Sequence, residues 1–246
     1  MQRLAREFGD QWRGGIVTYS GTQIEQLAPN CGRFLCSGSL ACRSIADFGG
    51  QTVSQQENSA GRIIFLNGAP CAGKTTIARA LQETLDEPYL HLSADHILSM
   101  LPQSFRNVNN PANYRAIYKA ISGMHYCVAT LATAGNNVIV DTVLVNSDNL
   151  AECVFILAHF RVTFVGVFCP LAELERRERE RGDRAVGMAR SQFEQVHAHQ
   201  IYDLEVDTSV TSAQAIAAEI KAYNERVPWP LAFRRIRKEK IVLRRE

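Results

Sequence analysis

Residues 68–75 read GAPCAGKT and fit the pattern G-x-x-x-x-G-K-[S/T] without a mismatch. In this pattern the glycines, here Gly68 and Gly73, let the backbone wrap so that successive N–H groups point at phosphate oxygens. Lys74 brings a positive charge to the β- and γ-phosphates, and the hydroxyl of Thr75 is a ligand suited to Mg²⁺. The stretch therefore predicts a loop that binds a nucleoside triphosphate with Mg²⁺, formed by Gly68, Ala69, Pro70, Cys71, Ala72, Gly73, Lys74, Thr75 and Thr76.

Two aspartates follow short apolar segments elsewhere in the chain. Asp141 ends the run VIVD, and Asp95 comes just after YLHLS. Because parallel strands deliver their carboxyl ends to one edge of a sheet, both carboxylates are expected near the phosphate loop. Asp141 would then lie near the metal, whereas Asp95 could accept a hydrogen bond from an incoming alcohol and orient its oxygen toward the γ-phosphate. The alternatives are that Asp141 caps a surface turn and that Asp95 caps the helix HILSML.

An arginine-rich segment, ERRERERGDRAVGMAR, lies later in the chain. Arg177 and Arg181 are four residues apart and share a helical face, and Arg184 lies between two glycines at 182 and 187. Arginines beside a glycine-bounded loop predict a lid that closes over the triphosphate and stabilises charge on the transferring group. The alternative is a solvated helical face with Glu–Arg pairs, which is how we interpret Arg176 and Arg179.

Strands and helices alternate from residue 62 to residue 226. The short apolar runs RIIFLNG, YLHLS, NNVIVDTVL, RVTFVGVFC and LEVDTS are typical of buried parallel strands, and helical spacing separates them. This order predicts an α/β fold of the P-loop nucleoside triphosphatase type, similar to nucleoside and shikimate kinases. It would have a five-stranded parallel sheet, helices on both faces and an arginine-bearing lid. We expect a kinase domain at 61–226, preceded by a poorly ordered leader at 1–60 and followed by a basic, solvated tail at 227–246.

The charge distribution and the lengths of the apolar runs indicate which partners the protein is expected to bind. The net charge is +2, but the last thirteen residues carry seven bases and two acids, so residues 1–233 hold 20 bases against 23 acids. A body of this charge is not expected to bind nucleic acid. No apolar run is long enough to span a membrane, and the N-terminus lacks the apolar core of a secretory signal, so we expect a cytoplasmic protein.

Several residues that could ligate metals do not form a convincing set. Cys31, Cys36 and Cys42 match no zinc spacing, and the odd total of seven cysteines indicates reduced thiols. No nearby cysteine or acid completes a convincing ligand set with His197 and His199, which are interpreted as helix-surface or core histidines. Asp207, at the end of LEVD, is expected to hold a turn near the nucleotide base.

Taken together, these segments resemble the chloramphenicol phosphotransferase-like family of small P-loop kinases from about residue 62 to residue 222. The resemblance rests on IIFLNGAPCAGKTTIARALQE, LHLSADHILSMLP, AGNNVIVDTVL, RGDRAVGMA and YDLEVDTS, in that order. It implies an ATP- and Mg²⁺-dependent phosphotransferase acting on a hydroxyl of a small molecule. In the resemblance Asp95 takes the position of the general base, and Arg181, Arg184 and Arg177 take those of the lid arginines.

The chain departs from the family pattern at three positions. Pro70 and Cys71 stand where the loop usually has serines, and Thr142 stands where a second acid or a histidine often follows the aspartate. The acceptor itself therefore remains open. Two other functions stay possible: a kinase of nucleotide-sugars or nucleic-acid ends, and a non-catalytic ATP-binding regulatory module. The scarcity of bases in residues 95–125 favours a largely neutral acceptor.

Overall fold

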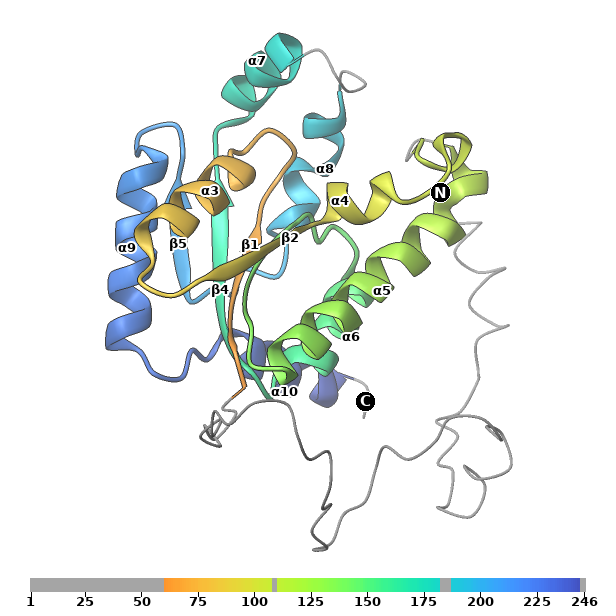
Figure 1. Cartoon of the computed structure of the whole chain (residues 1–246). Helices are drawn as coiled ribbons and strands as arrows, with labels where there is room; N and C mark the ends of the chain where they lie inside the picture. Colours follow the sequence, from red (N-terminus) through yellow and green to blue (C-terminus); the bar gives the residue numbers. More distant parts are fainter. Residues whose placement is uncertain (1–59, 108–109, 182–186, 244–246) are drawn as a thin grey trace, which may run out of the picture. The chain divides into compact units, whose positions relative to one another are not determined.

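The computed structural model describes residues 60–107, 110–181 and 187–243 (Figure 1). Its centre is a five-stranded, all-parallel sheet in the order β2-β3-β1-β4-β5, which confirms the predicted fold class. The strands are β1 (Arg62–Asn67), β2 (Tyr89–Ser93), β3 (Asn137–Thr142), β4 (Arg161–Phe168) and β5 (Leu204–Asp207). The predicted leader, residues 1–60, lies outside the described part of the chain except for its last residue.

Helices cover both faces of this sheet (Figure 1). They are α3 (Lys74–Thr84), α4 (Ala94–Ser99), α5 (Tyr114–Thr133), α6 (Ser147–Leu157), α7 (Leu171–Arg181), α8 (Met188–Val196), α9 (Ala213–Arg226) and α10 (Ala232–Leu243), with two short 3₁₀ turns at Gln103–Phe105 and Pro111–Asn113. None of the described helices is long and apolar enough to cross a lipid bilayer.

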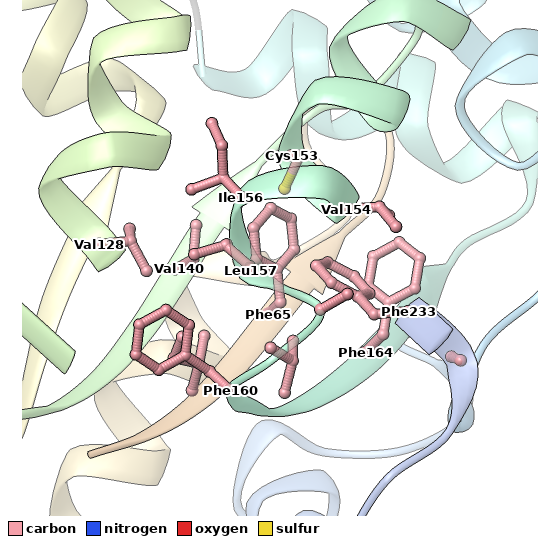
Figure 2. Close-up of a cluster of buried hydrophobic side chains, with 14 of the residues drawn as sticks. Phe65, Val128, Val140, Cys153, Val154, Ile156, Leu157, Phe160, Phe164 and Phe233 are labelled. Carbon is pink, nitrogen blue, oxygen red and sulfur yellow. The ribbon is translucent and has the colours of Figure 1, made fainter. Parts of the chain in front are cut away.

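The central strands are buried on both faces, which explains their continuously apolar sequence. In β1, Ile63 and Phe65 face one core cluster, whereas Ile64 and Leu66 face the other. The first cluster is completed by α5, α6 and α10, as Figure 2 shows around Phe65. The second is completed by α3 and α9, with Leu174 from α7 and two residues from α8. The sheet therefore holds the carboxyl ends of β1, β2 and β3 rigidly beside one another.

The C-terminal segment is not the solvated tail that its charge predicted. Phe233 on α10 is 2% exposed and packs against Phe65 and Phe164, with ring centroids 5.5 and 4.9 Å apart (Figure 2). The carboxylate of Asp203 accepts hydrogen bonds from the backbone N–H of Leu231 and of Ala232, 2.8 and 2.9 Å, where α10 begins. The prediction of a solvated tail was wrong because the many basic residues of this segment obscure a narrow apolar stripe on one face of the helix.

Candidate active site

The loop between β1 and α3 adopts the conformation that its glycines require. A Cβ added at Gly68 would lie 2.4 Å from the carbonyl oxygen of Val167, so only glycine fits there. Gly73 has φ of 86° and immediately precedes α3, a left-handed conformation that favours glycine. Cys71 is also left-handed, with φ of 62°. The loop thus turns sharply enough to present the start of α3, with its partial positive charge, toward a bound anion.

Lys74 is held against the loop that precedes it. Its Nζ is buried and donates to the carbonyl oxygens of Gly68 and Ala69, at 3.0 and 2.9 Å. It also lies 4.0 Å from Oδ1 of Asp141. These contacts hold the ammonium group against the loop.

Thr75 and Asp141, the two predicted metal ligands, lie in direct contact. The Thr75 hydroxyl donates to Oδ2 of Asp141 at 2.6 Å, because β3 is the neighbour of β1 and Asp141 is in register with Leu66. Burial acts to raise the pKa of Asp141, but His91, the charge of Lys74 and the Thr75 hydroxyl together lower it below its ordinary value. An ionised carboxylate beside a hydroxyl is a pair of hard oxygen ligands suited to Mg²⁺. The interpretation of Asp141 as a turn cap is therefore wrong.

Within the described ranges, no three His, Cys, Asp or Glu side chains gather in a way that could hold a metal ion by themselves. Mg²⁺ bound beside substrate phosphates takes most of its ligands from water and phosphate and needs only one or two protein groups. Neither His197 nor His199 is fully exposed; both are half-buried. His197 stacks on Phe168 and shares a hydrogen bond of 2.7 Å with the hydroxyl of Tyr202.

Asp95 lies in the first turn of α4 but does not cap it. The cap is Ser93, whose hydroxyl accepts a hydrogen bond from the His96 N–H at 3.1 Å. The capping interpretation of Asp95 is therefore wrong. Asp95 is exposed and lines the same cavity as Lys74 and Asp141.

This cavity has a volume of about 450 Å³, within the usual range for small-molecule sites. It is bounded by the phosphate loop, the ends of β2 and β3, helix α7 and the segment after β5. Its lining includes most of the predicted site, namely Pro70, Cys71, Gly73, Lys74, Thr75, Thr76, Asp95, Asp141, Arg177 and Arg181. The structure thus gathers residues that span more than a hundred positions of the sequence.

The lid arginines occupy different environments. Arg177 donates to the hydroxyl and the carbonyl oxygen of Thr208, at 3.1 and 2.9 Å, and to Glu173. The Thr208 hydroxyl in turn donates to the carbonyl oxygen of Ala72 at 3.0 Å, so Arg177 is tied to the phosphate loop through Thr208. Arg181 is exposed and lines the cavity. Arg184 lies outside the described residues, and its role stays a prediction.

Among the remaining charged residues of α7, Arg176 is exposed to solvent and Glu178 is buried. Arg176 pairs with Glu173 and Glu180 on the exposed face, as expected for a solvated helix. Glu178, in contrast, is 2% exposed and accepts hydrogen bonds from the backbone N–H of Gly187 and of Ala189, at 2.8 and 2.9 Å. It therefore caps the start of α8 and connects the two helices that flank residues 182–186. The sequence offered one signal for this: Glu178 lies four residues after the buried Leu174.

Two further residues at the site were not singled out from the sequence. Asn67, fully buried at the end of β1, donates to the carbonyl of Val196 and to Tyr202, and accepts from the N–H of Leu144. It thus connects the base of the phosphate loop to the end of α8 and to the segment after Asp141.

His91, on β2, lies beside Asp141. Its Nε2 is 3.8 Å from Oδ2 of Asp141. Asp207, at the end of β5, accepts hydrogen bonds from the N–H and the hydroxyl of Ser209, at 2.8 and 2.7 Å, and so holds a turn; its expected position near the nucleotide base stays a prediction. Neither His91 nor Asn67 belongs to a motif or spacing from which its place at the site could have been predicted.

Comparison with known proteins agrees with this geometry. Residues 61–225 match the family model described as chloramphenicol phosphotransferase-like protein, and the chain belongs to that family. A Mycobacterium tuberculosis protein that carries the provisional name O-phosphotransferase is 30% identical over 199 residues, which cover 72% of this chain and 88% of the relative.

Solved structures show the same fold. The APS kinase of Mycobacterium tuberculosis, solved with AMPPNP and APS, aligns with a TM-score of 0.54 at 18% identity, covering 68% of this chain and 98% of the kinase. A sugar kinase from Janibacter aligns with a TM-score of 0.55 at 15% identity, covering 68% and 96%. At these identities the likeness establishes a kinase-type P-loop fold.

Proposed function

We propose that this protein is an ATP- and Mg²⁺-dependent phosphotransferase that moves the γ-phosphoryl group to a hydroxyl of a small molecule. One observation carries the proposal. A single cavity of about 450 Å³ is lined both by Lys74, Thr75 and Asp141 and by Asp95. The first group suits a metal-bound triphosphate, and the second is a carboxylate within the same space. The family and the provisional name of the relative agree with O-phosphorylation.

The residues that line the cavity would have separate roles in the transfer. The loop N–H groups and Lys74 would hold the β- and γ-phosphates, and Thr75 and Asp141 would hold Mg²⁺, which neutralises charge on the phosphates. Asp95 would accept the hydrogen bond of the acceptor hydroxyl and direct its oxygen at the γ-phosphorus. As the new P–O bond forms and the bond to the β-phosphate breaks, the hydroxyl proton passes to Asp95 and ADP leaves. Arg181 would stabilise charge on the group in transfer.

The acceptor is proposed to be a largely neutral molecule. Of the few bases in residues 95–125, Arg106 donates to the carbonyl oxygens of Leu101 and Ser99, at 2.7 and 2.5 Å. The guanidinium of Arg106 is therefore already hydrogen-bonded to the local backbone. Among residues of the acceptor region, the cavity lining includes Asp95 but no arginine or lysine. This arrangement disfavours a nucleotide-sugar or nucleic-acid end as acceptor, since those substrates need cationic partners.

The test is direct. The full-length protein is incubated with ATP, Mg²⁺ and a panel of hydroxylated antibiotics and metabolites, and each mixture is searched by mass spectrometry for a phosphorylated product. Lys74→Ala serves as the control that loses the phosphate site. A product formed by the wild type and absent with Lys74→Ala supports the proposal. Phosphorylation confined to nucleotide-sugars or nucleic-acid ends would contradict the neutral acceptor, and ATP binding without transfer to any acceptor would favour a regulatory module.

A further inference from the structure

A second cavity lies at the amino ends of the strands, the edge of the sheet opposite the phosphate loop. It has a volume of about 680 Å³ and is bounded by the starts of β1, β2, β3 and β4 together with Trp229. The cavity shares no lining residue with the candidate active site. Its distinguishing feature is a pair of arginines, Arg62 and Arg161, which both line it.

These two arginines are placed where they repel one another. Arg62 begins β1 and Arg161 begins β4, and they are register partners on adjacent strands, so their Cα atoms are about 4.8 Å apart and their side chains lie on the same face. Like charges directly opposite in a sheet are destabilising. Burial lowers the pKa of Arg161, and the charge of Arg62 lowers it further.

The structure does not neutralise this pair. No carboxylate of the described residues forms an ion pair with either guanidinium. Arg62 interacts with the phenol of Tyr89, a neutral group. The one carboxylate in the cavity lining, Glu87, accepts a hydrogen bond from Asn137 at 2.9 Å.

Arg161 and Trp229 both line the cavity, and a further arginine lies over the ring of Trp229. The Nε of Arg161 is buried without a hydrogen-bond partner in the described part of the chain. The guanidinium carbon of Arg161 lies 5.7 Å from the ring centroid of Trp229, and that of Arg234 lies 5.0 Å from it. Trp229 lines the cavity and is 49% exposed.

We propose that this cavity binds a small, multiply charged oxyanion of the phosphate type between Arg62 and Arg161. Two guanidinium groups offer forked donors that match the oxygens of a phosphate. An anion between them replaces repulsion with two attractive contacts. This site is separate from the phosphate loop and does not depend on the proposed activity.

Trp229 provides a local reporter. The chain contains two tryptophans, at 12 and 229, so Trp12→Phe leaves Trp229 as the sole tryptophan. This full-length variant is titrated with inorganic pyrophosphate, without added metal and at constant ionic strength, and its fluorescence is followed. The titration is repeated with Lys74→Ala added, which weakens binding at the phosphate loop. We expect a saturable change that survives Lys74→Ala.

Charge-matched variants locate the ligand. Arg62→Gln and Arg161→Gln should each weaken binding about ten- to a hundredfold, the loss expected for a charge-assisted hydrogen bond. Arg79→Gln removes the same charge from the exposed side of α3 and should keep the affinity. Without ligand, Arg62→Gln should melt at the same temperature as the parent or higher, because a repulsion is removed.

Four results would overturn the proposal. These are no saturable change, an equal loss in Arg79→Gln, a signal abolished by Lys74→Ala alone, and a markedly lower melting temperature for both Arg62→Gln and Arg161→Gln, which would make the pair a structural feature.

Discussion

Replacing Asp95 with asparagine separates a chemical role from a structural one. Asn keeps the size and hydrogen-bonding shape of the side chain but loses the negative charge that accepts the proton. The cap of α4 is Ser93, and Asp95 is exposed, so the substitution disturbs neither a cap nor the core. The free energy of unfolding should therefore change by less than about 0.5 kcal/mol. Turnover should fall by about 10²–10⁴, which corresponds to roughly 2.7–5.5 kcal/mol of transition-state stabilisation.

The assay measures initial rates of product formation with the acceptor identified by mass spectrometry, together with ATP affinity. ATP affinity should stay within about twofold, because the phosphate loop is untouched. Asp86→Asn is the matched control, since Asp86 is an exposed carboxylate that pairs with Lys221 far from the cavity. Full phosphotransfer by Asp95→Asn, or an equal loss in Asp86→Asn, would refute the assignment of Asp95 as the base.

Three further predictions test the lid, the core and a buried histidine. Arg181→Ala should lower kcat more than it raises the KM for ATP, because the guanidinium acts on developing charge; unchanged kinetics would return Arg181 to the solvated face of α7. Phe233→Ala should cost about 3–5 kcal/mol in chemical denaturation, whereas a loss below about 1 kcal/mol would mean that α10 does not contribute to the core. His125 is fully buried, and burial lowers its pKa from 6.5 to about 4. Because the unfolded chain then binds a proton that the folded chain does not, stability should rise between about pH 4 and pH 6.5, by up to on the order of 3 kcal/mol. His125→Leu should flatten this rise, and an unchanged slope measured by denaturation across that range would contradict the reasoning.

The phosphate loop could be predicted because its determinants are local. Gly73 is required by its left-handed backbone, and Lys74 and Thr75 follow directly in the chain; Gly68 is recognised from its spacing, although the contact that excludes a side chain there comes from Val167 on β4. The order of strands and helices was equally accessible, since burial on both faces of a parallel sheet imposes continuous apolar runs. Asp141 and Asp95 followed from one topological rule, that parallel strands end at a common edge.

Other features depended on contacts between distant segments. Asn67 bonds to Val196, 129 residues away, and no local spacing marks either partner. Glu178 looked like one more charge on a solvated helix, and only the position of α8 shows that it is a buried cap. For Asp95, the sequence allowed both a cap and a base, and the hydroxyl of Ser93 decided against the cap.

By itself, the sequence determined the fold class, the phosphate loop and the edge of the sheet where the site lies, because backbone conformation and strand burial are encoded over a few neighbouring residues. The tertiary structure alone decided the packing of α10 and the juxtaposition of Arg62 with Arg161. Both depend on which elements become neighbours in space. The packing of an apolar stripe within a basic segment, or the partner of an arginine at the start of a strand, can be known only once the neighbouring element has been identified.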